Sequence, residues 1–215
     1  AAVSAAVADY LKSGAKADDV FARRFRRGFS APERAKANQV FKGLLRNLLP
    51  MRSAIEGLCK RPPRPLLKAA LLCACADIAV RKKAFQAADS WVEFIKAKFS
   101  KGESGFANAI LRKIPEALGR IEETAERNPS PENLALAYSH PEWLVKRWTA
   151  EFGPKKALEI LKNSRIPSDV FLRSSGSETA RILEEKFGKS LRPSPFEDFK
   201  ILEGGHWEVA EELLK

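Results

Sequence analysis

The sequence predicts a mainly α-helical protein, in which a helical bundle is followed by a helical connector and a partial α/β segment. Apolar residues recur three and four positions apart through most of the first 162 residues, as on one face of a helix. The stretch RNPSPEN at 127–133 has the composition of a linker. Beyond Pro167, two strand-like stretches flank a capped helix, which predicts a βαβ fragment. We expect domains at 1–128 (bundle), 129–166 (connector) and 167–215 (partial α/β segment).

Turn and capping residues divide the predicted bundle into successive helices. Gly14 and Gly28 end the first two helices, and Ser30 with Glu33 forms the capping-box pattern that starts a third. We expect Pro50 to end that third helix, because the proline ring clashes with the preceding turn inside a helix.

The longest apolar stretch predicts a buried central helix at 66–80. It is too short to span a bilayer and carries Lys68 and Asp77. Two further amphipathic helices follow, and Pro115 is expected to kink or break the second of them. No membrane partner is expected.

The stretch YSHPEWLVKRW at 138–148 predicts the start of the first connector helix. Ser139 and Glu142 form a second capping-box pattern. His140 has no other ligand nearby in the sequence, so we interpret it as a helix-start residue rather than a metal ligand or a base. The apolar stripe expected to face a core consists of Trp143, Leu144, Trp148 and Phe152.

Positive charge is concentrated at the amino-terminal end. The net charge is +11, and residues 1–65 hold 14 Lys or Arg against 5 Asp or Glu, whereas the remaining residues hold 24 against 22. A basic region beside a nearly neutral body is typical of nucleic-acid binding. Charge alone gives equal weight to a solvated surface that binds nothing.

Common catalytic and metal-binding motifs are missing from the sequence. There is no GxGxxG, no glycine-rich loop ending in GK[ST] and no HExxH. No CxxC pair occurs among Cys59, Cys73 and Cys75, and Cys73 and Cys75 would point about 200° apart on a helix. We interpret the cysteines as reduced, buried thiols of a cytoplasmic protein. The residues therefore predict no catalytic, cofactor-binding or metal-binding site.

Several segments nevertheless resemble a known family. The stretches SAPERAKANQVFKGLLRN (30–47), ALLCACADIAV (70–80), AADSWVEFIKAKF (87–99) and SGFANAILRKI (104–114) resemble successive helices of the NusB-like domain in their order and spacing. YSHPEWLVKRW, followed by FG, a helix and FLR, resembles the connector of the bacterial Sun-type ribosomal RNA cytosine-C5 methyltransferases. The joint occurrence indicates the NusB/Sun family, because the NusB-like part alone also occurs in transcription antitermination factors.

The resemblance implies the RNA-binding amino-terminal region of a 16S-type ribosomal RNA 5-methylcytosine methyltransferase. Such a region positions structured ribosomal RNA for a separate catalytic domain that uses S-adenosylmethionine. The cofactor loop and the two catalytic cysteines of the family have no counterpart here, so we expect this chain to bind no cofactor and to transfer no methyl group alone. Where the family usually continues with Val-Asn after the Leu-Arg pair, this chain has Ser174 and Ser175.

Two alternatives stay open. A stand-alone NusB-like adaptor would act in transcription antitermination through RNA and a ribosomal or transcription-factor protein. A degenerate paralogue would have lost catalysis and kept binding.

The candidate RNA-binding residues come from the basic front end and from SGFANAILRKI. In the first of these regions, Val20, Phe21 and Phe25 can dock while the arginines face outward. In the second, we expect Asn108 to satisfy buried backbone groups and Arg112 to face RNA. The full set is Arg23, Arg24, Arg26, Arg27, Arg34, Lys36, Lys42, Arg46 and Arg112.

Overall fold

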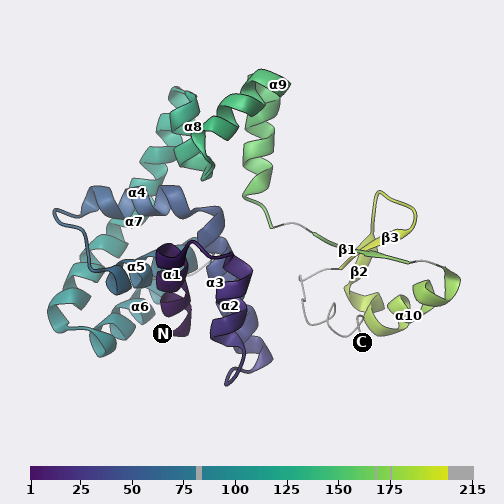
Figure 1. Ribbon diagram of the computed structural model, residues 1–215, viewed down its shortest axis with the longest axis horizontal. Coiled ribbons are helices and arrows are strands. Elements are labelled where there is room, and N and C mark those ends of the chain that lie inside the picture. Colours follow the sequence, from purple (N-terminus) through teal and green to yellow (C-terminus); the bar gives the residue numbers. More distant parts are fainter. Residues whose placement is uncertain (81–83, 168, 175, 203–215) are drawn as a thin grey trace. The chain divides into compact units, whose positions relative to one another are not determined.

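The computed structural model describes residues 1–80, 84–167, 169–174 and 176–202 (Figure 1). The chain forms two compact units, Ala1–Arg165 and Ile166–Lys215. The first is helical and the second contains a small sheet, so the predicted mainly α class is confirmed. The predicted division of the first unit at residue 128 stays a prediction.

A central buried helix, α5, organises the first unit. It packs against α1, α3, α4, α6 and α7, and every residue from 69 to 78 is buried, as predicted for a helix that is apolar all round. The helices of this unit are α1 (Ala2–Ser13), α2 (Ala17–Phe25), α3 (Ala31–Arg46), α4 (Leu48–Leu58), α5 (Pro65–Val80), α6 (Ala84–Lys98), α7 (Lys101–Arg127), α8 (Pro131–Tyr138) and α9 (Glu142–Ser164).

The predicted end of α1 and the predicted start of α3 are confirmed. Gly14 ends α1 in the left-handed region at φ 63°. At the start of α3, the Glu33 carboxylate accepts hydrogen bonds from the Ser30 N–H (2.8 Å) and the Ser30 hydroxyl (2.7 Å). These bonds hold the pKa of Glu33 below its usual value.

The prediction for Pro50 is wrong, and Pro115 does not break its helix. Helix α3 ends at Arg46, before Pro50, which lies in the first turn of α4, where a missing N–H costs nothing. Helix α7 continues through Pro115 as far as Arg127. Ile114 and Ala117, on either side of this proline, are both buried, so tertiary contacts keep the helix intact despite one lost hydrogen bond.

The predicted linker RNPSPEN contains the start of helix α8. The Ser130 hydroxyl accepts a hydrogen bond from the Asn133 N–H at 3.3 Å, and Pro131 occupies the first helical position. Helix α8 packs against α4, α7 and α9. Leu134, Tyr138, Val145 and Leu161 form a second hydrophobic cluster with its neighbours, which joins the connector to the bundle.

The predicted capping box at Ser139 is wrong. Ser139 adopts φ 60° at the end of α8, and its hydroxyl accepts the Leu49 N–H at 3.1 Å, so it serves the free first turn of α4 instead. The position that precedes α9 is Pro141. The neighbouring His140 lies with its Nδ1 2.7 Å from the Tyr138 carbonyl oxygen, and its ring stacks obliquely on Trp148.

The apolar stripe predicted for α9 faces a core only in part, because Trp148 packs against the second hydrophobic cluster while the two outer aromatic residues do not. Trp143 is 64% exposed and Phe152 is 47% exposed, whereas Val145 is fully buried. Gly153, at φ 77°, interrupts the helix before Pro154, so α9 consists of two helical halves. Because Val145 is buried, the buried face of α9 is rotated about the helix axis relative to the face that the aromatic spacing predicted.

The second unit is a split βαβ arrangement. Its elements are β1 (Val170–Arg173), α10 (Ser177–Phe187), the short 3₁₀ helix η1 (Gly188–Ser190), β2 (Leu191–Pro193) and β3 (Phe199–Leu202). The strand order is β1-β3-β2, with β3 antiparallel to both neighbours. In the predicted βαβ fragment, the second strand was the segment that forms β3. The second strand is in fact β2, a three-residue strand ending in proline, and β3 inserts between the two parallel strands.

Candidate functional site

Aromatic side chains fix the orientation of α2 on the bundle. The rings of Phe21 and Phe25 stack with centroids 4.4 Å apart, Phe21 lies 5.5 Å from Phe41 of α3, and Phe25 lies 4.9 Å from Phe29. Phe25 and Phe41 are buried. Because this face of α2 is turned inward, the arginines between the aromatic residues are turned toward solvent.

The predicted basic residues of α2 and α3 differ in exposure. Helix α2 ends at Phe25, earlier than predicted, so Arg26 and Arg27 lie in the turn that Gly28 closes at φ 81°. Lys42 and Arg46 are half-buried. The exposed members of the set on this part of the surface are Arg23, Arg24, Arg26, Arg27, Arg34 and Lys36.

Arg24 differs from the neighbouring arginines because it makes an ion pair. Its Nη2 lies 2.8 Å from Oδ2 of Asp9 on α1. Within the part of the chain that the structure describes, Arg23, Arg26 and Arg27 make no ion pair and no side-chain hydrogen bond. Three guanidinium groups therefore stand in solvent without a counter-charge, a suitable arrangement for binding phosphate oxygens.

Arg112 lies on a different part of the bundle. It is exposed on α7, which packs mainly against α6 and α4, whereas α2 packs against α1. The prediction for Asn108 is wrong, because this residue is only half-buried and its Oδ1 accepts a hydrogen bond from the Arg112 Nε at 3.2 Å. Asn108 therefore orients the guanidinium group.

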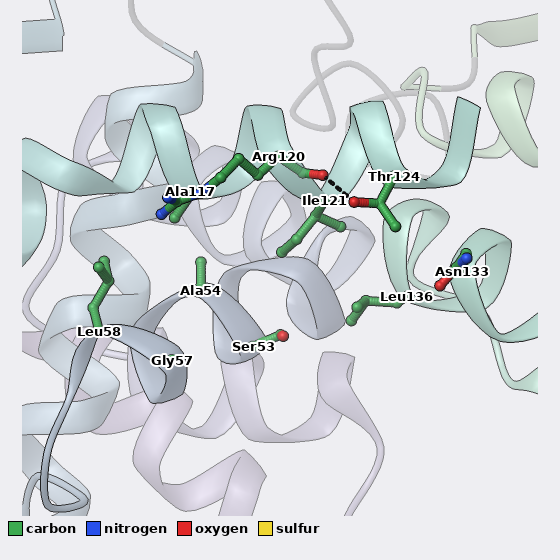
Figure 2. A pocket seen from close by; sticks show the side chains of 10 residues that line it. All are labelled: Ser53, Ala54, Gly57, Leu58, Ala117, Arg120, Ile121, Thr124, Asn133 and Leu136. Atoms are coloured by element: carbon green, nitrogen blue, oxygen red, sulfur yellow. Dashed lines mark hydrogen bonds between the residues drawn. The ribbon is translucent and has the colours of Figure 1, made fainter. Parts of the chain in front are cut away.

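Two cavities lie along α7. The smaller, of about 270 Å³, is an open pocket between α4, α7 and α8, and its lining includes the apolar side chains of Ala54, Ile121 and Leu136 (Figure 2). Figure 2 also shows the Thr124 hydroxyl, which donates to the Arg120 carbonyl oxygen at 2.7 Å. The larger cavity, of about 610 Å³, is lined by Lys60, Arg61 and Lys113, which the sequence analysis did not identify.

The thiols of this chain are poorly suited to nucleophilic chemistry. Cys73 and Cys75 are buried, as predicted, and desolvation raises the pKa of both thiols, that of Cys75 to about 12. Cys59 is half-buried, and desolvation raises its pKa as well. Because the thiolate is the nucleophilic form, the raised pKa values favour the protonated, weakly nucleophilic thiol at all three positions near neutral pH.

Metal-binding clusters and membrane spans were also sought in the described residues. Among them, no group of three or more His, Cys, Asp or Glu side chains could hold a metal ion. No helix in the described ranges is long and apolar enough to cross a membrane.

A comparison with known protein families gives the family of this chain. The model of the NusB family matches residues 4–116, which is more than half of the chain. The chain belongs to the NusB family. The matched region runs from α1 into α7 and includes the whole basic surface of α2 and α3.

One curated relative carries a functional description. The "Probable ribosomal RNA small subunit methyltransferase B" of Bacillus subtilis (strain 168) is 31% identical over 128 residues, which are 58% of this chain and 26% of the relative. The chain thus matches about a quarter of the length of that relative. Both comparisons suggest a role connected with ribosomal RNA.

Proposed function

We propose that this chain is the RNA-binding part of a small-subunit ribosomal RNA cytosine-C5 methyltransferase. In this role it positions structured ribosomal RNA for a catalytic domain that uses S-adenosylmethionine. The observation that carries the proposal is the cluster of exposed, unpaired arginines at Arg23, Arg26 and Arg27 in a NusB-family domain. The similarity of the chain to a ribosomal RNA methyltransferase supports ribosomal RNA as the ligand.

The mechanism is electrostatic positioning. The aromatic residues Phe21 and Phe25 hold the α2 backbone on the bundle, so the neighbouring guanidinium groups are presented from a fixed scaffold. Phosphate contacts of this kind set the register of an RNA without reading its sequence. Helical shape and unpaired bases then supply the selectivity. Arg24 contributes less, because its ion pair with Asp9 competes with phosphate for the guanidinium group.

Cofactor chemistry belongs to the catalytic domain in this proposal. The chain itself binds no S-adenosylmethionine, because its sequence has no glycine-rich loop that would let the backbone approach the cofactor closely. Calorimetric titration of the chain with S-adenosylmethionine should give no saturable heat.

Charge reversal of the unpaired arginines tests the proposal. The triple variant R23E/R26E/R27E should bind a structured fragment of small-subunit ribosomal RNA about tenfold or more weakly at low salt. The matched control R181E/K186E/K189E changes net charge equally, on exposed residues of α10 and the turn after it, and should bind within about threefold of the parent. Fluorescence anisotropy measures both affinities. Equal binding by the parent and the first variant would refute the assignment of this surface.

A stand-alone adaptor in transcription antitermination is the second candidate. The family match itself favours it, because NusB-like domains without a methyltransferase also occur in antitermination factors. An adaptor of this kind works through a protein partner. Tight RNA binding that appears only after addition of a ribosomal protein would favour this candidate over the first.

A further inference from the structure

The larger cavity along α7 is an open cleft on the surface of the first unit. One wall is the loop between α4 and α5, and the other is the α7 face that carries residues 106, 109, 110 and 113. Its volume of about 610 Å³ falls within the range of small-molecule sites, roughly 300–1,000 Å³. The lining consists of Leu58, Lys60, Arg61, Phe106, Ala109, Ile110 and Lys113.

A bidentate ion pair fixes the loop that forms the first wall. Arg64 donates from Nε to Oε1 of Glu103 at 2.6 Å and from Nη2 to Oε2 at 3.0 Å. Its guanidinium carbon also lies 4.7 Å from the centroid of the Phe99 ring. Pro62 and Pro63 restrict the loop backbone further. The cleft therefore does not depend on a loosely placed segment.

The charge in this cleft is positive and uncompensated. Lys60, Arg61 and Lys113 are exposed and make no ion pair within the described ranges. The nearby carboxylates already have partners, because Glu103 pairs with Arg64, and Glu56 accepts from Lys68 at 2.6 Å and from Arg52 at 2.9 Å. Three cations thus converge on one cavity without internal neutralisation.

The lining of the cleft also has an apolar part, which includes an aromatic ring. Phe106 is half-buried, and Leu58 and Ile110 line the cavity beside it. A lining that combines cations with an aromatic ring suits a nucleotide of single-stranded RNA, whose phosphate meets the cations while its base lies on the ring. A free anion would make no use of the apolar part.

We infer that this cleft binds an unpaired nucleotide of RNA, with the phosphate held by Lys60, Arg61 and Lys113 and the base against Phe106. The inference rests on the proposed RNA-binding function and adds a second contact surface to it. The arginines of α2 then hold the structured part of the RNA, and the cleft on α7 holds a single-stranded part.

The test uses the full chain and two RNA probes. The first is a single-stranded oligoribonucleotide of about ten nucleotides, and the second is a fully paired ribosomal RNA hairpin stem. The variant K60E/R61E/K113E should bind the single strand about tenfold or more weakly and the stem within about threefold of the parent. The variant R23E/R26E/R27E should show the larger loss for the stem, and R181E/K186E/K189E serves as the charge-matched control.

Two further measurements keep the test independent of folding. The neutral variant K60Q/R61Q/K113Q should show the same selectivity if the charge-reversed protein loses its helical circular dichroism. Phe106→Leu keeps an apolar side chain and removes the ring. It should weaken binding of the single strand by about threefold or more and leave binding of the stem unchanged. Photocrosslinking of a 4-thiouridine oligonucleotide should label the peptide that contains residues 104–114.

The failures of the two proposals are distinguishable. If the parent binds both probes and the cleft variants bind the single strand as tightly as the parent, the cleft assignment is wrong and the proposed function stands. If the parent binds neither probe, the proposed function fails and the cleft assignment fails with it.

Discussion

Replacing Arg165 with methionine should destabilise the first unit, because this side chain ties the end of α9 to three other parts of that unit. Its Nε donates to Oδ1 of Asn47 at 2.9 Å, and its Nη1 lies 2.8 Å from Oε1 of Glu122. Its guanidinium carbon also lies 5.8 Å from the centroid of the Tyr138 ring. The side chain is only 31% exposed, so part of this interaction is shielded from solvent.

The magnitude follows from these three contacts. A hydrogen bond from a charged donor contributes about 1.5–3 kcal/mol. The pair with Glu122, whose side chain is 53% exposed, contributes less than about 1 kcal/mol. The contact with the tyrosine ring adds about 0.5–1 kcal/mol. Because one side chain makes all three contacts, the energies do not add fully, and we expect a loss of about 2 kcal/mol.

Urea unfolding followed by circular dichroism measures this loss. A loss of about 2 kcal/mol should lower the melting temperature by about 4–8 °C in a chain of this size. Arg147→Met is the matched control, because Arg147 is exposed on the same helix and contacts Glu151 at 3.7 Å; it should cost less than about 0.5 kcal/mol. A free energy of unfolding for Arg165→Met within about 0.5 kcal/mol of the parent would show that the three contacts do not anchor α9.

The remaining predictions concern Ser139, Glu103 and Asn108. Ser139→Ala should cost about 1–2 kcal/mol in urea unfolding, because the Leu49 N–H loses its acceptor. Ser139→Gly should cost less, since glycine tolerates the observed φ of 60°, and equal costs would argue against this account. Arg64, and next Ser100, hold the pKa of Glu103 below its usual 4.5, so its contribution is complete above pH 4.5 and is lost as the pH falls through the lowered pKa. Glu103→Gln should therefore lower the melting temperature at pH 7, and its difference from the parent should shrink as the pH falls through the lowered pKa; a constant difference would contradict the ion pair. Asn108→Ala should cost less than about 1 kcal/mol, because its bond to Arg112 lies at the surface; a loss above about 2 kcal/mol would restore a buried role.

The helices of the bundle could be predicted because their buried faces are regular in the sequence. The stretch 66–80 is predominantly apolar and its residues 69–78 form the buried centre, and the capping box at Ser30 starts α3 as expected. Prediction was wrong where tertiary contacts override local preference. Pro115 lies inside α7, and the Ser139 hydroxyl bonds to Leu49, which is 90 positions away in the sequence.

The candidate surfaces could be predicted only in part, for the same reason. The basic front end is evident from composition, but only the fold shows that Asp9 pairs with Arg24 and leaves Arg23 without a partner. The cleft was missed because Lys60 and Lys113 lie far apart in the sequence and meet only when the α4–α5 loop lies against α7. Strand β2 was missed because three residues are too few for a periodic signal.

The salt dependence of RNA binding tests the central claim most directly. Each phosphate contact contributes about 0.7–0.9 to the slope of log Kobs against log salt concentration. If Arg23, Arg26 and Arg27 each bind a phosphate, the neutral variant R23Q/R26Q/R27Q should reduce the slope for a small-subunit ribosomal RNA fragment by about 2–3. Arg24→Gln, which removes a side chain already paired with Asp9, should change the slope by less than about 0.5. An unchanged slope and affinity in the triple variant would contradict RNA binding through this surface.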